Sequence, residues 1–211
     1  MNKIATTDTG GRQQRLAGLR PLTEPAGAWI QKLCRSLAIA WLCLAWLPHA
    51  PGAEDTSLEY KVKAGFLYNF AKFVEWPSNS LPASNSPIVI GVFADDPAAP
   101  VLKQALDGKM VNGRSLIVKS LSETAALSTC HIFFLSRARQ DRLKDVLGQV
   151  NAAPILTVGE MDQFAQRGGV INFVRADDSF RFEVNLEVAE KAGLKISAKL
   201  ANMATIVKTR K

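Results

Sequence analysis

The stretch GGVINFVRADDSFRFEVN, residues 168–185, decides how this chain is expected to fold. It contains two short runs of β-branched and aromatic residues, Val170–Val174 and Phe180–Val184, on either side of a polar turn. Too few residues separate the runs for a crossover helix, so they must pair antiparallel as a β-hairpin. Helical patterns follow at about Leu186–Ala192 and Ser197–Lys208.

Upstream of the hairpin, helical patterns alternate with short apolar runs. Apolar residues recur at steps of three and four from Leu58 to Trp76, which predicts a long helix. The predicted strands are Ile88–Phe93, Leu116–Val118, Ile132–Leu135 and Ile155–Val158. The predicted intervening helices begin at Asp96 and Ser136, with a short one at Met161–Gln166.

Continuously apolar strands separated by helices are typical of a mostly parallel sheet that is covered on both faces. The fold class predicted is therefore α/β. We expect a single three-layer α/β/α sandwich whose mostly parallel sheet ends in the C-terminal antiparallel hairpin.

Residues 1–53 have the composition of a signal peptide with a basic segment before it. Residues 1–35 contain six basic and two acidic residues, and the apolar run Ser36–Leu47 follows directly. Small and helix-breaking residues then lead to Ala53. This order is typical of export, and the apolar run is shorter than the roughly 20 residues of a membrane span. We expect residues 54–211 to form one periplasmic domain, with an uncleaved N-terminal anchor as the alternative.

The basic character of the chain belongs largely to the predicted targeting segment. Six of the 26 basic residues and two of the 19 acidic residues lie within residues 1–53, so the formal net charge falls from +7 to +3 without them. A nucleic-acid-binding surface needs Lys and Arg gathered on one face. The sequence therefore gives no support for a nucleic-acid partner.

Two carboxylates, Asp95 and Asp96, follow the first predicted strand, where α/β folds place ligands. Together with Ser136, which follows another strand, they are candidates for a small-molecule site. The alternative for Asp96 is a helix N-cap, because Pro97 suits the first helical position. Gly168-Gly169 is too short for a phosphate loop. We expect no cofactor and no metal, and a binding or regulatory protein rather than an enzyme.

Cys130 is the single cysteine of residues 54–211, so that region cannot form an internal disulfide. Either it pairs with another chain, which makes it the redox candidate, or it is buried and inert. Burial is favoured because free cysteine is among the most buried residue types. His131 follows it, but neighbouring side chains on a strand diverge, which argues against a thiolate–imidazole pair.

The hairpin supplies the candidate partner-binding residues. Charged residues surround its turn, and a polar turn is ordinarily only solvated. Its last strands and the final helix also provide an edge for strand addition or a face for dimerisation. The candidates for partner contact are Asn172, Phe173, Arg175, Phe182 and Asn185.

Several segments in order resemble the YfiR-like family of periplasmic proteins. They are residues 60–77 (YKVKAGFLYNFAKFVEWP), Ile90-Gly91-Val92, Cys130-His131-Ile132, Leu156–Gly159, residues 168–174, Phe182–Asn185 and residues 192–197 (AGLKIS). The resemblance covers nearly all of residues 58–208. One departure is clear: well-known members carry further cysteines that form stabilising disulfides, whereas residues 54–211 keep only Cys130.

The resemblance implies a periplasmic repressor that binds the periplasmic sensor region of an inner-membrane signalling enzyme, such as a diguanylate cyclase or a sensor kinase. An OmpA-like outer-membrane lipoprotein would relieve repression by sequestering it. Envelope stress would thus reach cyclic-di-GMP and biofilm formation. The alternative is a small-molecule-binding module near Asp95, Asp96 and Ser136 that feeds a membrane sensor. The repressor hypothesis predicts exposed apolar residues around Phe173, Phe182 or the final helix.

Overall fold

The computed structural model describes residues 53–151, 153–176 and 179–210. The predicted targeting segment lies outside these residues, except for Ala53. No helix within the described ranges is both long and apolar enough to cross a lipid bilayer.

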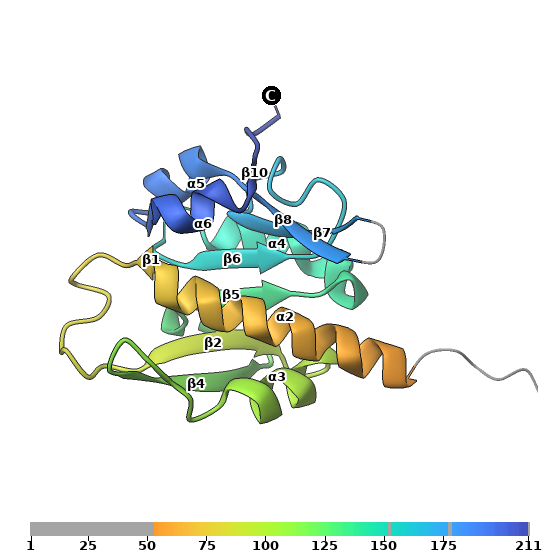
Figure 1. Cartoon of the computed structure of the whole chain (residues 1–211), viewed down its shortest axis with the longest axis horizontal. Helices are drawn as coiled ribbons and strands as arrows, with labels where there is room; N and C mark the ends of the chain where they lie inside the picture. The colour runs from red at the N-terminus through yellow and green to blue at the C-terminus, as the bar shows by residue number, and fades with distance from the viewer. Residues whose placement is uncertain (1–52, 152, 177–178, 211) are drawn as a thin grey trace, which may run out of the picture. The chain divides into compact units, whose positions relative to one another are not determined.

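A mixed sheet runs through the middle of the described domain (Figure 1). Its strand order is β10 (Thr205–Ile206), β8 (Ser179–Val184), β7 (Ile171–Ala176), β6 (Leu156–Gly159), β5 (Ile132–Leu135), β2 (Ile88–Phe93), β4 (Arg114–Leu121) and β3 (Met110–Val111). The strands from β7 to β4 are all parallel. β8 pairs antiparallel with β7 from Ala176↔Ser179 to Ile171↔Val184, which confirms the predicted hairpin.

Helices cover both faces of the sheet, so the three-layer α/β/α sandwich is confirmed. One face carries α2 (Ala53–Phe73), α3 (Ala98–Leu106), α5 (Leu186–Lys191) and α6 (Ala198–Asn202). The other face carries the 3-10 helices η1 (Thr124–Thr129) and η2 (Arg137–Arg142), and α4 (Leu143–Gln149).

The central strands are apolar throughout because both of their faces are buried. In β5, Ile132 and Phe134 pack toward α2, whereas Phe133 and Leu135 pack toward α4. All six residues of β2 are buried as well. This two-sided burial explains the continuous apolar runs of the sequence.

The first helix ends earlier than the pattern predicts. α2 stops at Phe73, and Val74 and Glu75 form β1 (Val74–Glu75) instead of a further turn of helix. β1 pairs antiparallel with β9 (Lys195–Ile196), which lies far away in the sequence. Val74 and Trp76 do pack against the core, but they do so from an extended segment and not from a helix.

Of the predicted helices after β6, the one at 161–166 was wrong and the one at 197–208 is shorter than predicted. The segment 161–166 is a series of turns, in which Gln163 has a φ of 59°. The ring of Phe164 holds it in place, lying so close to Gly159 and Gly169 that a Cβ there would come within 2.5 Å and 2.1 Å of ring atoms. The predicted helix 197–208 ends at Asn202, after which β10 pairs parallel with β8.

The chain changes direction within the parallel part of the sheet. From β2 it passes through α3 to β4 on one side, and from β4 it crosses to β5 on the other side of β2. The carboxyl ends of β2 and β5 therefore flank a topological switch point, the place where open α/β sheets bind ligands.

Candidate functional site

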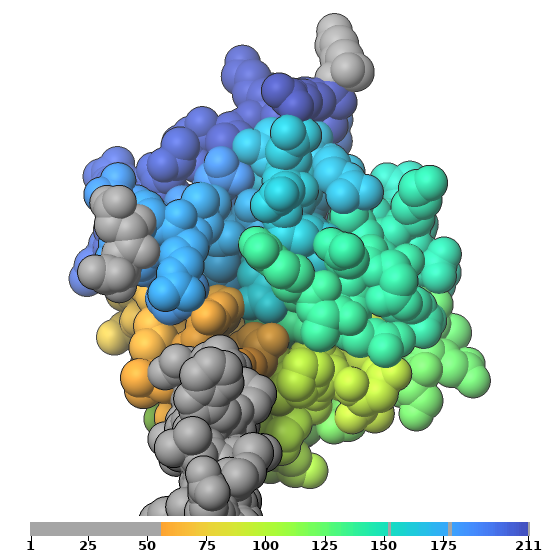
Figure 2. All heavy atoms as spheres, turned by 90° about the vertical axis from the view of Figure 1, so that its right-hand side faces the viewer, coloured from red at the N-terminus to blue at the C-terminus, as the bar shows by residue number. Residues whose placement is uncertain are grey.

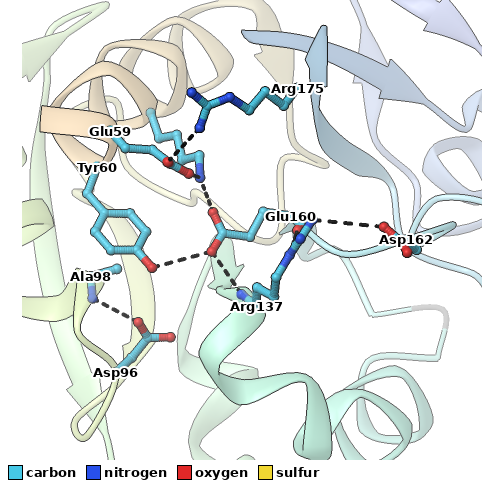
Figure 3. A network of polar contacts seen from close by, with 9 residues as sticks. Glu59, Tyr60, Asp96, Ala98, Arg137, Glu160, Asp162 and Arg175 are labelled. Atoms are coloured by element: carbon cyan, nitrogen blue, oxygen red, sulfur yellow. Dashed lines mark hydrogen bonds and ion pairs between the residues drawn. The ribbon is translucent and has the colours of Figure 1, made fainter. Parts of the chain in front are cut away.

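Segments from five elements meet at the carboxyl edge of the parallel strands. Figure 2 looks onto this edge, where the beginning of α2, the residues after β5 and the β7–β8 hairpin come together. Glu160 follows β6, Arg137 follows β5, and Lys63 projects from α2. These residues form the polar network of Figure 3.

A buried ion pair forms the centre of the network. Lys63 is 2% exposed and Glu160 is 7% exposed, and the ammonium group contacts the carboxylates of both Glu160 and Glu59. A buried charge needs such partners, because transferring an unpaired ion from water to the protein interior costs roughly several kcal/mol. Rings of Tyr60 and Phe180 lie 5.2 Å and 5.1 Å from the Lys63 nitrogen, distances at which a cation and a ring face attract.

Three further donors complete the surroundings of Glu160. The backbone N–H of Arg137 donates to Glu160 Oε1 at 2.8 Å, and the Tyr60 hydroxyl donates to the same oxygen at 3.4 Å. Arg137 Nε donates to the Glu160 carbonyl at 3.3 Å. Burial, and then the Glu160 charge, raise the pKa of Tyr60. The phenol therefore stays protonated at neutral pH and can donate a hydrogen bond but not act as a base.

A cavity of about 310 Å³ opens beside this network. Its wall combines aromatic rings with charged groups: Tyr60, Phe173 and Phe180, together with Lys63, Arg137, Glu160, Glu59 and Arg175. Arg175 lies 3.9 Å from Glu59 and its side chain is 71% exposed. The cavity can hold a small polar molecule or one side chain of a partner, and its cations and carboxylates can orient such a group.

The residues predicted for a small-molecule site lie at the same edge but do not line this cavity. Asp96 is buried, and Ala98 N donates to its Oδ1 at 2.8 Å, which confirms its predicted role as a helix cap. Asp95 is exposed and pairs with Arg139 at 2.8 Å. Ser136 is buried, and its hydroxyl acts to lower the pKa of Tyr60, against the larger effect of burial. Ligand binding by these three residues stays a prediction.

The predicted exposure of the apolar hairpin residues was wrong. Phe173 and Phe182 are 4% and 3% exposed, and both pack on the rings of Phe66 and Phe70. They belong to the core because α2 covers the side of the sheet on which they lie.

The hairpin asparagines are buried too. Asn172 donates to Glu183 Oε2 at 3.3 Å. Asn185 caps α5 by accepting from Val188 N, and it donates to the Ala165 carbonyl at 2.9 Å. Of the five candidates for partner contact, Arg175 alone has an exposed side chain.

Cys130 is buried, as predicted, on the face of the sheet opposite to α2. Burial raises the pKa of its thiol, against smaller lowering effects of Thr129 and Lys119. A thiol with a raised pKa forms little thiolate and reacts slowly. The neighbouring His131 points elsewhere: Val89 N donates to its Nδ1 at 3.0 Å, and its Nε2 donates to the Ser80 carbonyl at 3.0 Å.

Sequence reasoning missed Lys63 and Glu160, the centre of the site. A signal was present for each. Lys63 falls on the face of the predicted helix that also carries Tyr60, Leu67 and Phe70, where a charged residue is unusual unless it is paired. Glu160 comes two residues after a predicted strand, at the ligand-binding edge of such sheets.

No curated protein is significantly similar to the chain in sequence. One similar solved structure is described as an ABC domain in complex with L-Trp from Streptococcus pneumonia (8% identity, 68% of this chain, TM-score 0.46). Another is a conserved domain protein from Vibrio cholerae (12% identity, 71% of this chain, TM-score 0.46). The match spans 60% of each of these chains.

The profile of the YfiR/HmsC-like family matches residues 60–205, from within α2 to the first residue of β10. This range includes every other strand of the central sheet and the whole Lys63–Glu160 network except Glu59. The chain therefore belongs to the YfiR/HmsC-like family, whose members are periplasmic regulators of cyclic-di-GMP signalling rather than catalysts.

Proposed function

We propose that this protein represses an inner-membrane signalling enzyme, a diguanylate cyclase in the first instance, by binding its periplasmic sensor region. The observation that carries this proposal is the family match over residues 60–205, which covers the central sheet from β2 to the first residue of β10. The site chemistry is compatible with it. The Lys63 and Glu160 charges are already paired, and the Tyr60 phenol and the Cys130 thiol have raised pKa values, which suits binding better than nucleophilic catalysis.

Repression across a membrane is a population shift. A periplasmic protein has no access to cytoplasmic nucleotides, so it acts by binding one state of the sensor more tightly than the other. The shift can be no larger than this difference in affinity, and moving a sensor from mostly active to mostly inactive takes roughly 5 kcal/mol.

Release follows from the same mass action. We propose that an OmpA-like outer-membrane lipoprotein competes for the protein and lowers its free concentration. Reversible exchange between two partners favours interfaces of modest size. Envelope stress would then raise cyclic-di-GMP and promote biofilm formation.

The test begins with deletion of the gene and measurement of cellular cyclic-di-GMP. We expect the deletion to raise cyclic-di-GMP, and complementation with the full chain to restore it. Crosslinking from native envelopes with the complementing protein should recover an inner-membrane protein that has a cytoplasmic cyclase or kinase domain. Unchanged cyclic-di-GMP together with no such protein would refute the proposal.

The cavity beside Glu160 favours a second candidate, a small-molecule-binding module that feeds a membrane sensor. Its volume of about 310 Å³ suits a metabolite, and its wall offers aromatic rings and charges of both signs. A ligand at 100 times its dissociation constant should stabilise the fold by about 2.7 kcal/mol. A thermal-shift screen of periplasmic metabolites checks this, with Arg175→Ala as the variant that should lose the shift.

A further inference from the structure

A second and larger hollow is lined by residues of α2 and of the region of α3 and β3. Figure 1 shows α2 and α3 on the same face of the sheet. The volume of the hollow is about 530 Å³. Lys61, Gly65 and Tyr68 line it from α2, and Ala105, Lys109 and Met110 line it from the region of α3 and β3. We refer to this hollow as the α2–α3 groove.

The charge of the α2–α3 groove is positive. Its lining includes Lys61 and Lys109 and no carboxylate. Within the part of the chain that the structure describes, neither lysine makes an ion pair. The carboxylates nearest to the two lysines in sequence are directed elsewhere. Asp107 accepts a hydrogen bond from Val118 N at 2.8 Å, and Glu59 pairs with Lys63 and Arg175. Two unpaired cations beside a hollow favour an acidic partner.

Large apolar side chains are exposed in the groove and next to it. Met110, which lines the groove, is 57% exposed. Leu58 and Val62, one turn apart on α2, are 63% and 42% exposed, and helical spacing places them on the side of α2 that carries Lys61 and Gly65. Met110, Leu58 and Val62 are three of the six large apolar side chains that stand exposed among the described residues. Apolar surface rimmed by charge is typical of a protein-interaction site.

Gly65 gives the groove its depth. It lies in the middle of α2, where glycine costs about 0.5–1 kcal/mol relative to alanine. A Cβ at this position would meet no heavy atom within 4 Å, so internal packing does not require glycine. Because glycine has no side chain, the backbone of α2 is uncovered at this position, and the backbone of a partner can approach it closely.

Hydrogen bonds hold the groove in shape. The Tyr68 hydroxyl donates to the Met110 carbonyl at 2.9 Å, and Asn112 Nδ2 donates to the Lys72 carbonyl at 3.0 Å. Both tie the β3 turn to α2. The groove therefore exists before any partner binds, and binding would cost little reorganisation.

We propose that the α2–α3 groove receives an acidic amphipathic helix of the membrane partner. A helix suits the hollow because it can lie in the groove between two others, about 8–10 Å from each axis. Its acidic residues would pair with Lys61 and Lys109, and its apolar residues would cover Val62 and Met110. A second copy of this chain would instead bring like charges together. This inference rests on the proposed function and adds to it the surface and the chemistry of recognition.

The first test is site-specific photo-crosslinking in native envelopes with the full chain. A photoreactive residue at position 69, which lines the groove, is compared with one at exposed position 144 in α4, on the opposite face of the sheet. We expect position 69 to crosslink an acidic, helix-forming segment of the inner-membrane protein, and position 144 not to. Crosslinks from position 69 to a second copy of this chain, or to a segment without carboxylates, would overturn the proposal.

The second test measures affinity for a synthetic peptide of the crosslinked segment. The variant Lys61→Glu/Lys109→Glu should weaken binding at least about tenfold, whereas Lys144→Glu/Lys191→Glu, with the same change in charge outside the groove, should not. Replacing the acidic residues of the peptide by lysine should restore binding to the first variant. Equal affinities of the two variants for the peptide would overturn the proposal that the α2–α3 groove binds it.

The two proposals fail in different ways. If the protein lowers cyclic-di-GMP and other positions capture the membrane enzyme while position 69 does not, the repressor function stands and the groove is refuted. If no position captures a membrane protein and cyclic-di-GMP does not respond, both are refuted.

Discussion

Lys63 on α2 and Glu160 at the end of β6 form a buried ion pair although they lie 97 residues apart in the sequence. This pair joins the first helix to the carboxyl edge of the sheet, and Tyr60 and the Arg137 backbone bind the same carboxylate. Removing one partner of such a pair leaves a charge buried without compensation, which typically costs about 3–5 kcal/mol.

We expect Lys63→Met to lower the free energy of unfolding by an amount in that range, measured by urea denaturation. Adding Glu160→Gln should recover part of the loss, because glutamine is neutral and still accepts from Arg137 N. Arg175→Ala, which removes an exposed partner of Glu59 and of the Phe180 ring, should cost less than about 1 kcal/mol. Strictly additive effects of Lys63→Met and Glu160→Gln would show that the two side chains are not coupled.

Gly169 is predicted to be intolerant of any side chain. A Cβ at this position would lie 2.1 Å from Phe164, whose ring is fully buried and cannot move aside. We expect Gly169→Ala to lower the free energy of unfolding by about 1–3 kcal/mol, the usual cost of overpacking. The control is Gly148→Ala in α4, where a Cβ meets nothing and alanine should be neutral or stabilising. A Gly169→Ala protein as stable as the wild type would contradict the packing around Phe164.

The imidazole of His131 should make the fold less stable in mild acid. Burial is the main cause that lowers its pKa below the ordinary value of 6.5. The unfolded chain therefore takes up a proton first, so stability is complete above pH 6.5 and falls as the pH drops toward the folded pKa. The slope for one group is at most about 1.4 kcal/mol per pH unit.

This pH dependence is checked with urea denaturation at pH 7.5 and pH 5.5. His131→Asn should be less stable than the wild type at pH 7.5, and the difference between the two should shrink at pH 5.5. An unchanged difference would mean that His131 does not titrate in this range.

The thiol of Cys130 should be unreactive until the protein unfolds. Its burial and raised pKa both disfavour the thiolate. In a Cys34→Ser/Cys43→Ser background, we expect labelling by a thiol reagent at pH 8 to be slow in buffer and complete within minutes in denaturant. Fast labelling of the folded protein would restore Cys130 as a redox-sensing residue.

Local patterns in the sequence predicted those helices and strands that are determined by residues close together in the sequence. β2 and β5 have the bounds that their apolar runs predict, and the hairpin follows from two runs too close for a crossover. The pairing of Val74 with Ile196 and the parallel pairing of β10 depend on residues more than 20 positions away in sequence. No local pattern shows such contacts. Periodicity therefore extended both neighbouring helices too far.

The site was harder to predict than the fold for the same reason. Lys63 is visible as a charge on a buried helix face, but its partner is defined only when β6 is placed beside α2. The predicted contacts in the hairpin were wrong for Phe173 and Phe182 because both side chains are buried against α2. The sequence alone does not distinguish an apolar residue that packs in the core from one on an exposed contact surface.

Burial within the hairpin leads to a last prediction, which separates folding from partner binding. Phe173→Asp places a charge among Phe66, Phe70 and Phe182, so we expect loss of the cooperative unfolding transition and of repression together. Arg175→Glu reverses an exposed charge beside the cavity, so the protein should stay folded while it represses less well. Circular dichroism melts and cellular cyclic-di-GMP are the two measurements. Full repression by a folded Arg175→Glu protein would exclude Arg175 from the interface, and with it the one predicted partner contact whose side chain is exposed.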